Sequence, residues 1–197
     1  LLESEESQVL LKNCKRENIG VNVKLPPDVK VVMQNGKVKL DRDYLEGISN
    51  PIAIILNGKL TIGDDVDRSL IDEKIYSMIV NGKIICPKKL VGIIQSKGMI
   101  SGVTVGYNEG YILIDDLVEI TDQFLNSLKP NTKLAVSRLM AVGDFDLELL
   151  EGKISNIQVL SKLIATEDNE KILSKYIDDY YSLSKVLVPV EAKYIDD

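Results

Sequence analysis

Two clusters of aspartates are the first residues whose types and spacing could do chemistry. One cluster is Asp64, Asp65 and Asp67, and the other is Asp144 and Asp146. Closely spaced carboxylates suit calcium, but a calcium loop needs further oxygen ligands at fixed spacing and a closing glutamate, which both clusters lack. Each cluster precedes an apolar-periodic segment, where an aspartate accepts a backbone N–H at a helix start. We therefore predict helix caps here and no metal site.

The sequence is poor in the residues that catalysis most often uses. Histidine is absent, which excludes Ser-His and Cys-His pairs. Neither a phosphate-binding glycine loop nor a dinucleotide fingerprint is present. Asp and Glu together number 30, so a carboxylate-based hydrolase is the enzymatic alternative. The prediction is a non-enzymatic protein without catalytic residues, cofactor or metal.

The two cysteines, Cys14 and Cys86, lie far apart in the sequence and form no Cys-x-x-Cys pair. Without histidine they cannot complete a mixed zinc site. We predict two buried, unreactive thiols, which is the common state of free cysteine. A disulfide between them is the alternative.

A glycine-rich stretch in the middle of the chain carries the candidate binding residues. Its sequence Gly-Tyr-Asn-Glu-Gly-Tyr, residues 106–111, separates two apolar runs, 103–105 and 111–114, which we predict to be strands joined as a hairpin. Tyrosine and asparagine exposed on a loop suit contacts with another protein. In the alternative, the tyrosines pack on the sheet. The candidate protein-contact residues are Tyr107, Asn108 and Tyr111.

Composition narrows the class of partner. The 197 residues have a formal net charge of -6 and 45% hydrophobic content, which indicates a packed core rather than disorder. Nucleic-acid binding needs clustered Lys and Arg, whereas the lysines here are scattered among acids. A membrane span needs a run of about 18 apolar residues, which the sequence lacks. We predict another protein, or a second copy of the chain, as the partner.

The first residues bear on location. The chain begins Leu1-Leu2-Glu3 rather than with Met, as a processed or trimmed sequence would. The cytoplasm is the default expectation. A secreted or cell-surface location stays open, because a leader could have been removed.

Most of the chain is a series of related segments. Asn-Gly-Lys follows an apolar run three times, with its Asn at positions 35, 57 and 81, at spacings of 22 and 24. A period in this range indicates a repeat solenoid. Each apolar run is followed by a segment typical of a short helix, such as 63–75 with its opening aspartates. Each unit is therefore predicted as strand, turn and short helix.

The second half repeats the first in degenerate form. Residues 143–154 match 63–75 with one residue fewer, and 154–164 match 75–85 without a gap, with Leu160-Ser161 in place of Asn-Gly. We accordingly predict a repeat array with two halves around the glycine-rich middle. The predicted parts are an N-terminal helix and capping segment (1–28), the array (29–182, with halves 29–97 and 111–182), and a C-terminal strand and tail (183–197).

The spacing Ile75-x-x-Met-x-Val-x-x-Lys-x-Ile85 resembles the leucine-rich repeat consensus, Leu-x-x-Leu-x-Leu-x-x-Asn-x-Leu. Residues 154–164 fit the same template, and the segments that begin at positions 29, 52 and 134 fit it loosely. The resemblance implies an α/β solenoid with strands on a concave face. Lys83 and Lys162 stand where the family has Asn, and because a buried Lys is costly, we expect these lysines to point outward.

Two other architectures compete with this solenoid. Asn-Gly between apolar runs is the strongest short signal for a hairpin, which would make 52–62 and 76–85 antiparallel hairpins in an α+β domain. A parallel β-helix is the third possibility. The gapless match that replaces Asn-Gly by Leu160-Ser161 favours a bend in a stacked repeat. The predicted function is a protein–protein interaction module, and the alternative is a structural protein that self-assembles through edge-strand pairing.

Overall fold

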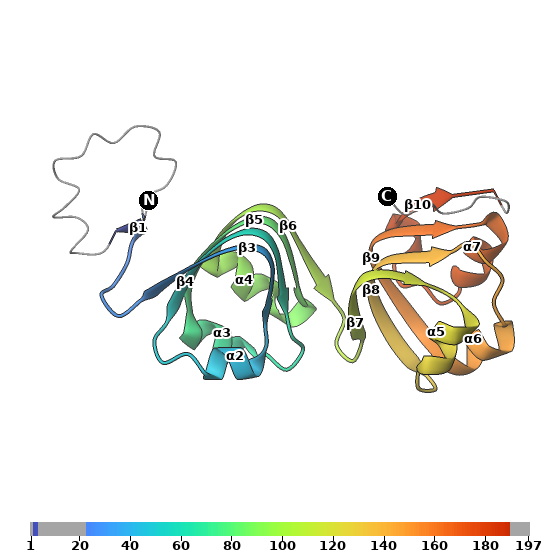
Figure 1. Ribbon diagram of the computed structural model, residues 1–197, viewed down its shortest axis with the longest axis horizontal. Coiled ribbons are helices and arrows are strands. Elements are labelled where there is room, and N and C mark those ends of the chain that lie inside the picture. The colour runs from blue at the N-terminus through green and yellow to red at the C-terminus, as the bar shows by residue number, and fades with distance from the viewer. Residues whose placement is uncertain (1, 4–22, 190–197) are drawn as a thin grey trace. The chain divides into compact units, whose positions relative to one another are not determined.

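The computed structural model describes residues 2–3 and 23–189 and has an α/β fold (Figure 1). The chain divides into two compact units, residues 1–106 and 107–197. Each unit contains one four-stranded parallel sheet with short helices between the strands. Within the described residues, no helix has the length and apolar character that crossing a membrane requires.

The predicted N-terminal helix and capping segment lies mostly outside the described residues. The two described residues at its start form a strand, β1 (Leu2–Glu3), instead of a helix. This strand pairs in parallel with β2 (Val23–Lys24).

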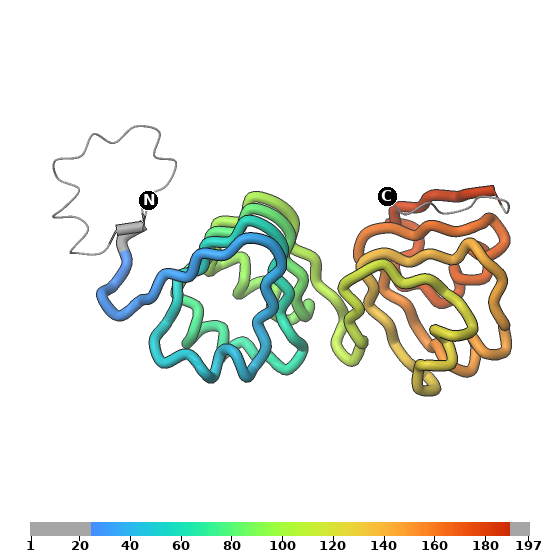
Figure 2. The backbone as a smooth tube through the Cα atoms, in the orientation of Figure 1, coloured from blue at the N-terminus to red at the C-terminus, as the bar shows by residue number. Residues whose placement is uncertain are grey.

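The first unit builds its sheet in chain order, β3-β4-β5-β6. Figure 2 shows the four strands following one curved path, one behind another. The short helices lie across the open side of this arc (Figure 1). The strands are β3 (Lys30–Leu40), β4 (Ile52–Ile62), β5 (Ile75–Pro87) and β6 (Gly98–Tyr107). The helices are α2 (Arg42–Glu46), α3 (Arg68–Lys74), the 3-10 turn η1 (Lys88–Leu90) and α4 (Val91–Lys97).

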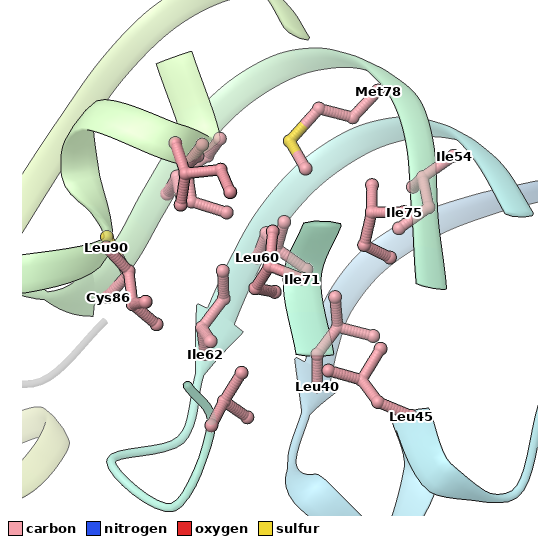
Figure 3. Packing of buried hydrophobic residues seen from close by; sticks show 14 of the residues in the cluster. Leu40, Leu45, Ile54, Leu60, Ile62, Ile71, Ile75, Met78, Cys86 and Leu90 are labelled. Carbon is pink, nitrogen blue, oxygen red and sulfur yellow. The ribbon is translucent and has the colours of Figure 1, made fainter. Parts of the chain in front are cut away.

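The curved strands enclose a core because their apolar residues alternate. In β4, every second residue from Ile52 to Ile62 faces inward, and all of these are buried except the glycine at the bend, Gly58, which is half-buried. Leu70 and Ile71 of α3 pack against the same cluster. Figure 3 shows side chains from strands and helices meeting in this interior. The core consists of aliphatic side chains together with Met78 and Cys86.

The hairpin alternative is wrong. Asn57-Gly58 lies inside the continuous strand β4, and it pairs in parallel with Asn35-Gly36 on one side and Asn81-Gly82 on the other. The glycines have positive φ values of 93°, 143° and 147°. This backbone conformation bends each strand without reversing it, so the dipeptide makes a corner instead of a hairpin turn.

Stacking makes glycine compulsory at the inner corners. A Cβ on Gly58 would lie 2.1 Å from the carbonyl oxygen of Gly36, and one on Gly82 would lie 1.8 Å from that of Gly58. The same relation continues to Gly102 of β6, where the distance to the oxygen of Gly82 is 1.9 Å. We call Gly36, Gly58, Gly82 and Gly102 the glycine ladder.

The second unit repeats the plan with a sheet in the order β10-β9-β8-β7. All three pairs of neighbouring strands in this sheet are parallel. The strands are β7 (Ile112–Glu119), β8 (Thr132–Ala141), β9 (Ile154–Ala165) and β10 (Ser184–Leu187). The helices are α5 (Asp122–Ser127), α6 (Leu147–Lys153), α7 (Glu167–Leu173) and the 3-10 turn η2 (Tyr180–Ser182).

The predicted hairpin between 103–105 and 111–114 is wrong as well. The first run belongs to β6 of the first sheet. Residues 112–114 of the second run belong to β7 of the second sheet. The intervening glycine-rich residues therefore pass between two units instead of turning back within one sheet.

Candidate functional site

The tyrosines predicted as exposed contact residues are buried. Tyr107 is 2% exposed and Tyr111 is 8% exposed, while Asn108 is half-buried. The expectation of a loop that presents aromatic rings to solvent is therefore wrong for both tyrosines. The alternative, in which the rings pack against the protein, describes their environment, although the hairpin assumed for it does not form.

Tyr111 and Asn108 take part in a polar network around Asp178. The Tyr111 hydroxyl donates to Asp178 Oδ2 at 2.6 Å, and Asn108 Nδ2 donates to the same oxygen at 3.4 Å. Asn156 Nδ2 donates to Asp178 Oδ1 at 3.2 Å. The backbone N–H of Asn108 donates to Gln158 Oε1 at 2.8 Å. We call these five residues the Asp178 network.

The Asp178 network holds the start of the second unit against its C-terminal part. Burial, reinforced by the Asp178 carboxylate, raises the pKa of Tyr111 to about 12. The phenol is consequently a neutral hydrogen-bond donor at physiological pH and neither a base nor a nucleophile. Asp178 itself is fixed by the parallel bridge between Ile157 and Ile177. The arrangement is suited to holding the chain together.

Sequence reasoning missed Asp178, Asn156 and Gln158. Tyr111 and Asp178 are 67 positions apart, and no local pattern links them. The one available signal is the alternation of Asn156 and Gln158, which places two amides on one face of β9.

One aspartate of each cluster caps a helix, as predicted. Asp67 Oδ1 accepts the backbone N–H of Leu70 at 2.9 Å, at the start of α3. Asp146 Oδ1 accepts the N–H groups of Glu148 and Leu149, at the start of α6. Among the described residues, no group of three or more His, Cys, Asp or Glu side chains is placed to hold a metal ion.

Asp67 also joins two successive helices of the first unit. Arg42 of α2 donates from its guanidinium to Asp67 Oδ2 at 2.7 Å. The hydroxyl of Ser69, the N–H of Leu70 and Arg42 together hold the pKa of Asp67 well below its ordinary range. The carboxylate is therefore charged and has its partners within the protein, which is a structural role.

Cys86 is buried and free in the described part of the chain. Burial raises the pKa of its thiol to about 12. This matches the predicted inert thiol, because the thiolate is the reactive form. Cys14 lies outside the described residues.

The edge of the first sheet is the described surface best suited to binding. β3 is the terminal strand, and its Val31 and Met33 are 44% and 71% exposed. The equivalent positions on β4 are Ala53, which is 1% exposed, and Ile55, which is half-buried. The apolar pattern of the interior strands thus continues onto a strand whose outer side pairs with no other described strand.

The opposite edge of the same sheet has the same character. β6 is the other terminal strand, with Met99 46% exposed and Val103 58% exposed. An open parallel edge offers a row of backbone N–H and C=O groups that can bond an added strand. Comparison of the chain with protein-family models, curated proteins and solved structures finds no match.

Proposed function

We propose that this chain is a non-enzymatic protein–protein interaction module built on two short solenoids. The parallel, residue-for-residue pairing of β3 with β4 supports a coiled repeat in which each strand begins a new turn. The leucine-rich-repeat-like spacing at 75–85 and 154–164 supports the same architecture. A parallel β-helix is the related alternative, since it stacks parallel strands in the same way.

The observation that carries the interaction function is the β3 edge. It extends over 11 residues, Lys30–Leu40, and it exposes Val31 and Met33. We propose that a partner adds an extended strand to this edge, so that backbone hydrogen bonds supply affinity and the two apolar side chains select the partner. A single added strand makes a small interface, and small interfaces are typical of weak, transient complexes. We therefore expect micromolar binding.

The experiment compares capture of partners from cell extract by three forms of the protein. The double variant Val31→Lys/Met33→Lys places charges on the β3 edge, and Tyr76→Lys places one at a 42% exposed position on the interior strand β5. We expect the unchanged protein and Tyr76→Lys to retain the same partner and the double variant to lose it. Retention by the double variant, or turnover of a substrate by a protein that captures nothing, would contradict the proposal.

Self-assembly is the second candidate function. It is favoured by one specific observation, which is that both edges of the first sheet are open among the described strands and both carry exposed apolar side chains. The β3 edge of one copy could therefore pair with the β6 edge of another copy.

A further inference from the structure

We propose that the β3 edge binds the β6 edge of a second copy of this chain, with Gly102 of one copy beside Gly36 of the other. This inference rests on the interaction function proposed above and names its partner. It predicts a continuous parallel sheet that runs from one copy into the next.

The strand directions permit this union without distortion. All four strands of the sheet point the same way and follow chain order from β3 to β6. A second copy placed one strand spacing beyond β3, about 4.8 Å away, therefore presents β6 in parallel orientation. Its backbone groups then meet those of β3 as the groups of β3 meet those of β4.

The exposed methionines of the two edges match in this register. Met33, Ile55 and Ile79 occupy one column across β3, β4 and β5. The close approach of Gly102 to Gly82 continues the glycine ladder to β6, and Met99 lies three residues before Gly102. Met33 and Met99 are therefore the two ends of one column. Joining two copies brings these exposed methionines together and removes apolar surface from water.

The charges are compatible with the same register. Lys37, Lys59 and Lys83 form a column across β3, β4 and β5. At the corresponding position, one residue after the ladder glycine, β6 has Val103. Union of the edges places Val103 beside Lys37 and avoids a further lysine pair, which would be destabilising in adjacent strands.

Gly36, at the β3 edge, is the one glycine of the ladder that has no carbonyl oxygen beside it. A Cβ on Gly36 would meet no atom within 4 Å, whereas at the three later steps it would lie between 1.8 and 2.1 Å from the preceding carbonyl oxygen. In the proposed assembly, the carbonyl of Gly102 from the second copy occupies this space. The positive φ of 93° already accounts for glycine at position 36, so Gly36 sets the register and the exposed side chains supply the attraction.

The union is head-to-tail, because different edges meet. Such a contact leaves one free edge at each end of every oligomer, so it grows into open chains unless the geometry closes a ring. We expect a concentration-dependent series of oligomers and not a single closed dimer.

Cross-linking tests the register directly. In a Cys14→Ser background, protein with Met33→Cys is mixed with protein with Met99→Cys under oxidising conditions. The two cysteines would lie on adjacent strands about 4.8 Å apart, within disulfide range. Within one copy they are three strands apart, about 14 Å, so a bond between them is intermolecular. We expect a mixed dimer from the mixture, and a ladder of oligomers from protein that carries both Met33→Cys and Met99→Cys.

The matched control is Met33→Cys mixed with Val103→Cys. These positions differ by four residues along the strand, about 13 Å, which is too far for a disulfide. Cys86 is buried with its pKa raised to about 12, so it stays out of the reaction. Cross-linking in the control and not in the test mixture would overturn the register.

Gly36→Ala tests the contact proposed at this glycine by sedimentation velocity over a range of concentrations. Its methyl group meets nothing within 4 Å in the single copy but would meet the incoming carbonyl in the assembly. We expect association to weaken at least about tenfold, and Met33→Glu, which leaves the backbone unchanged, to weaken it similarly.

Three outcomes would overturn the inference. One is a monomer at every concentration together with absent cross-links. A second is a monomer whose β3 amides resist hydrogen exchange, which would assign the edge to the chain's own N-terminal segment. The third is a monomer that binds a different protein through β3, which would leave the proposed interaction function standing.

Discussion

The two units bend their strands around a core in different ways. In the first unit, β3, β4 and β5 have equal numbers of residues at the corner, and glycine at positive φ makes the bend. In the second unit, β8 has only Ser137 between its paired residues Val136 and Arg138. The neighbouring strand β9 has Leu160 and Ser161 at this place, so two residues oppose one, as in a β-bulge.

The difference shows what each corner demands of the sequence. A glycine ladder tolerates no side chain on its inner steps, because each inner glycine touches the carbonyl of the one before. A bulge relieves the crowding by adding a residue to one strand, and it therefore accepts side chains such as those of Leu160 and Ser161. The loss of Asn-Gly from the second unit follows from this change of corner.

Among variants that distinguish the two corners, we expect Gly58→Ala or Gly82→Ala to cause the largest loss of unfolding free energy. The added methyl group would collide with a backbone carbonyl, at 2.1 or 1.8 Å, that the stacked strands hold in place. We expect a loss of more than about 4 kcal/mol of unfolding free energy or failure of the first unit to fold. Chemical denaturation followed by circular dichroism measures it.

Gly36→Ala and Gly152→Ala are the controls for this prediction. Gly36 has the same sign of φ without a close neighbour, so its variant loses only the conformational part of the effect. Gly152 lies in α6 of the second unit with open space around it, where Ala is the better helix former. Equal losses for Gly36→Ala and Gly58→Ala would show that contact between strands does not determine the corner.

The next effect is expected from Tyr111→Phe, which removes the hydroxyl that donates to Asp178 at 2.6 Å. Hydrogen bonds to charged groups contribute about 1.5 to 3 kcal/mol, so we expect a loss of about 2 kcal/mol confined to the second unit. Tyr44→Phe, at a 44% exposed position in the first unit, is the matched control and should change stability little. Denaturant unfolding monitored by hydrogen exchange assigns the loss to a unit.

Tyr111 also predicts a dependence on alkaline pH. Its pKa is raised to about 12 in the folded protein, above the ordinary value of 10.0. The folded state holds the proton more tightly, so this stabilisation is complete below about pH 10 and is lost as the pH rises toward 12. Tyr111→Phe should lack this part of the decline. An unchanged decline in the variant would assign the alkaline loss to other groups.

A smaller effect is expected at the bulged corner of the second unit. Ser137 is buried, and its hydroxyl donates to Asp115 Oδ1 on β7 at 2.7 Å. Ser137→Ala leaves that carboxylate without this donor, and we expect a loss of about 1.5 kcal/mol. Ser161→Ala, at the exposed corner position of β9, should be near neutral. Thermal unfolding of the two variants measures the difference. Equal losses of stability would show that the Ser137 hydroxyl does not stabilise the corner.

The smallest effect compares the two helix caps. Asp67→Ala and Asp146→Ala each remove a helix cap, so both should lower the midpoint of thermal unfolding slightly. Asp67 also pairs with Arg42, but both side chains are partly exposed, so solvent screens the pair and its loss should add little to the loss of the cap. Because the pKa of Asp67 is lowered, its contribution is present at neutral pH and is lost as the pH falls below the ordinary aspartate range. Thermal unfolding at pH 7 and in acid measures both effects.

Local patterns predicted the parts of this fold that local chemistry decides. The aspartates before apolar-periodic segments cap helices, because a cap needs only the next three residues. Asn-Gly was ambiguous, since glycine at positive φ serves a hairpin and a corner equally well. The neighbour across the sheet decides between them, and that neighbour is 22 or 24 residues away.

Long-range partners explain the failures at the candidate site. The candidate contact residues Tyr107 and Tyr111 are both buried, and the partner of Tyr111, Asp178, is 67 positions away. Exposure of Met33 was equally hidden, because its sequence context matches that of Ile55 and Ile79 on interior strands. Only the position of β3 at the end of the sheet distinguishes it.

The matched register at the corners of the first unit makes its strand–helix segments interchangeable. Asn35 lies opposite Asn57, which lies opposite Asn81, and from Ala53 to Thr61 of β4 every column is matched in the same way on both sides. Loss of residues 52–74 would therefore bring β3 against β5 with asparagine on asparagine and glycine on glycine. Loss or gain of one such segment would therefore change the sheet by one strand and keep the register of the remaining corners.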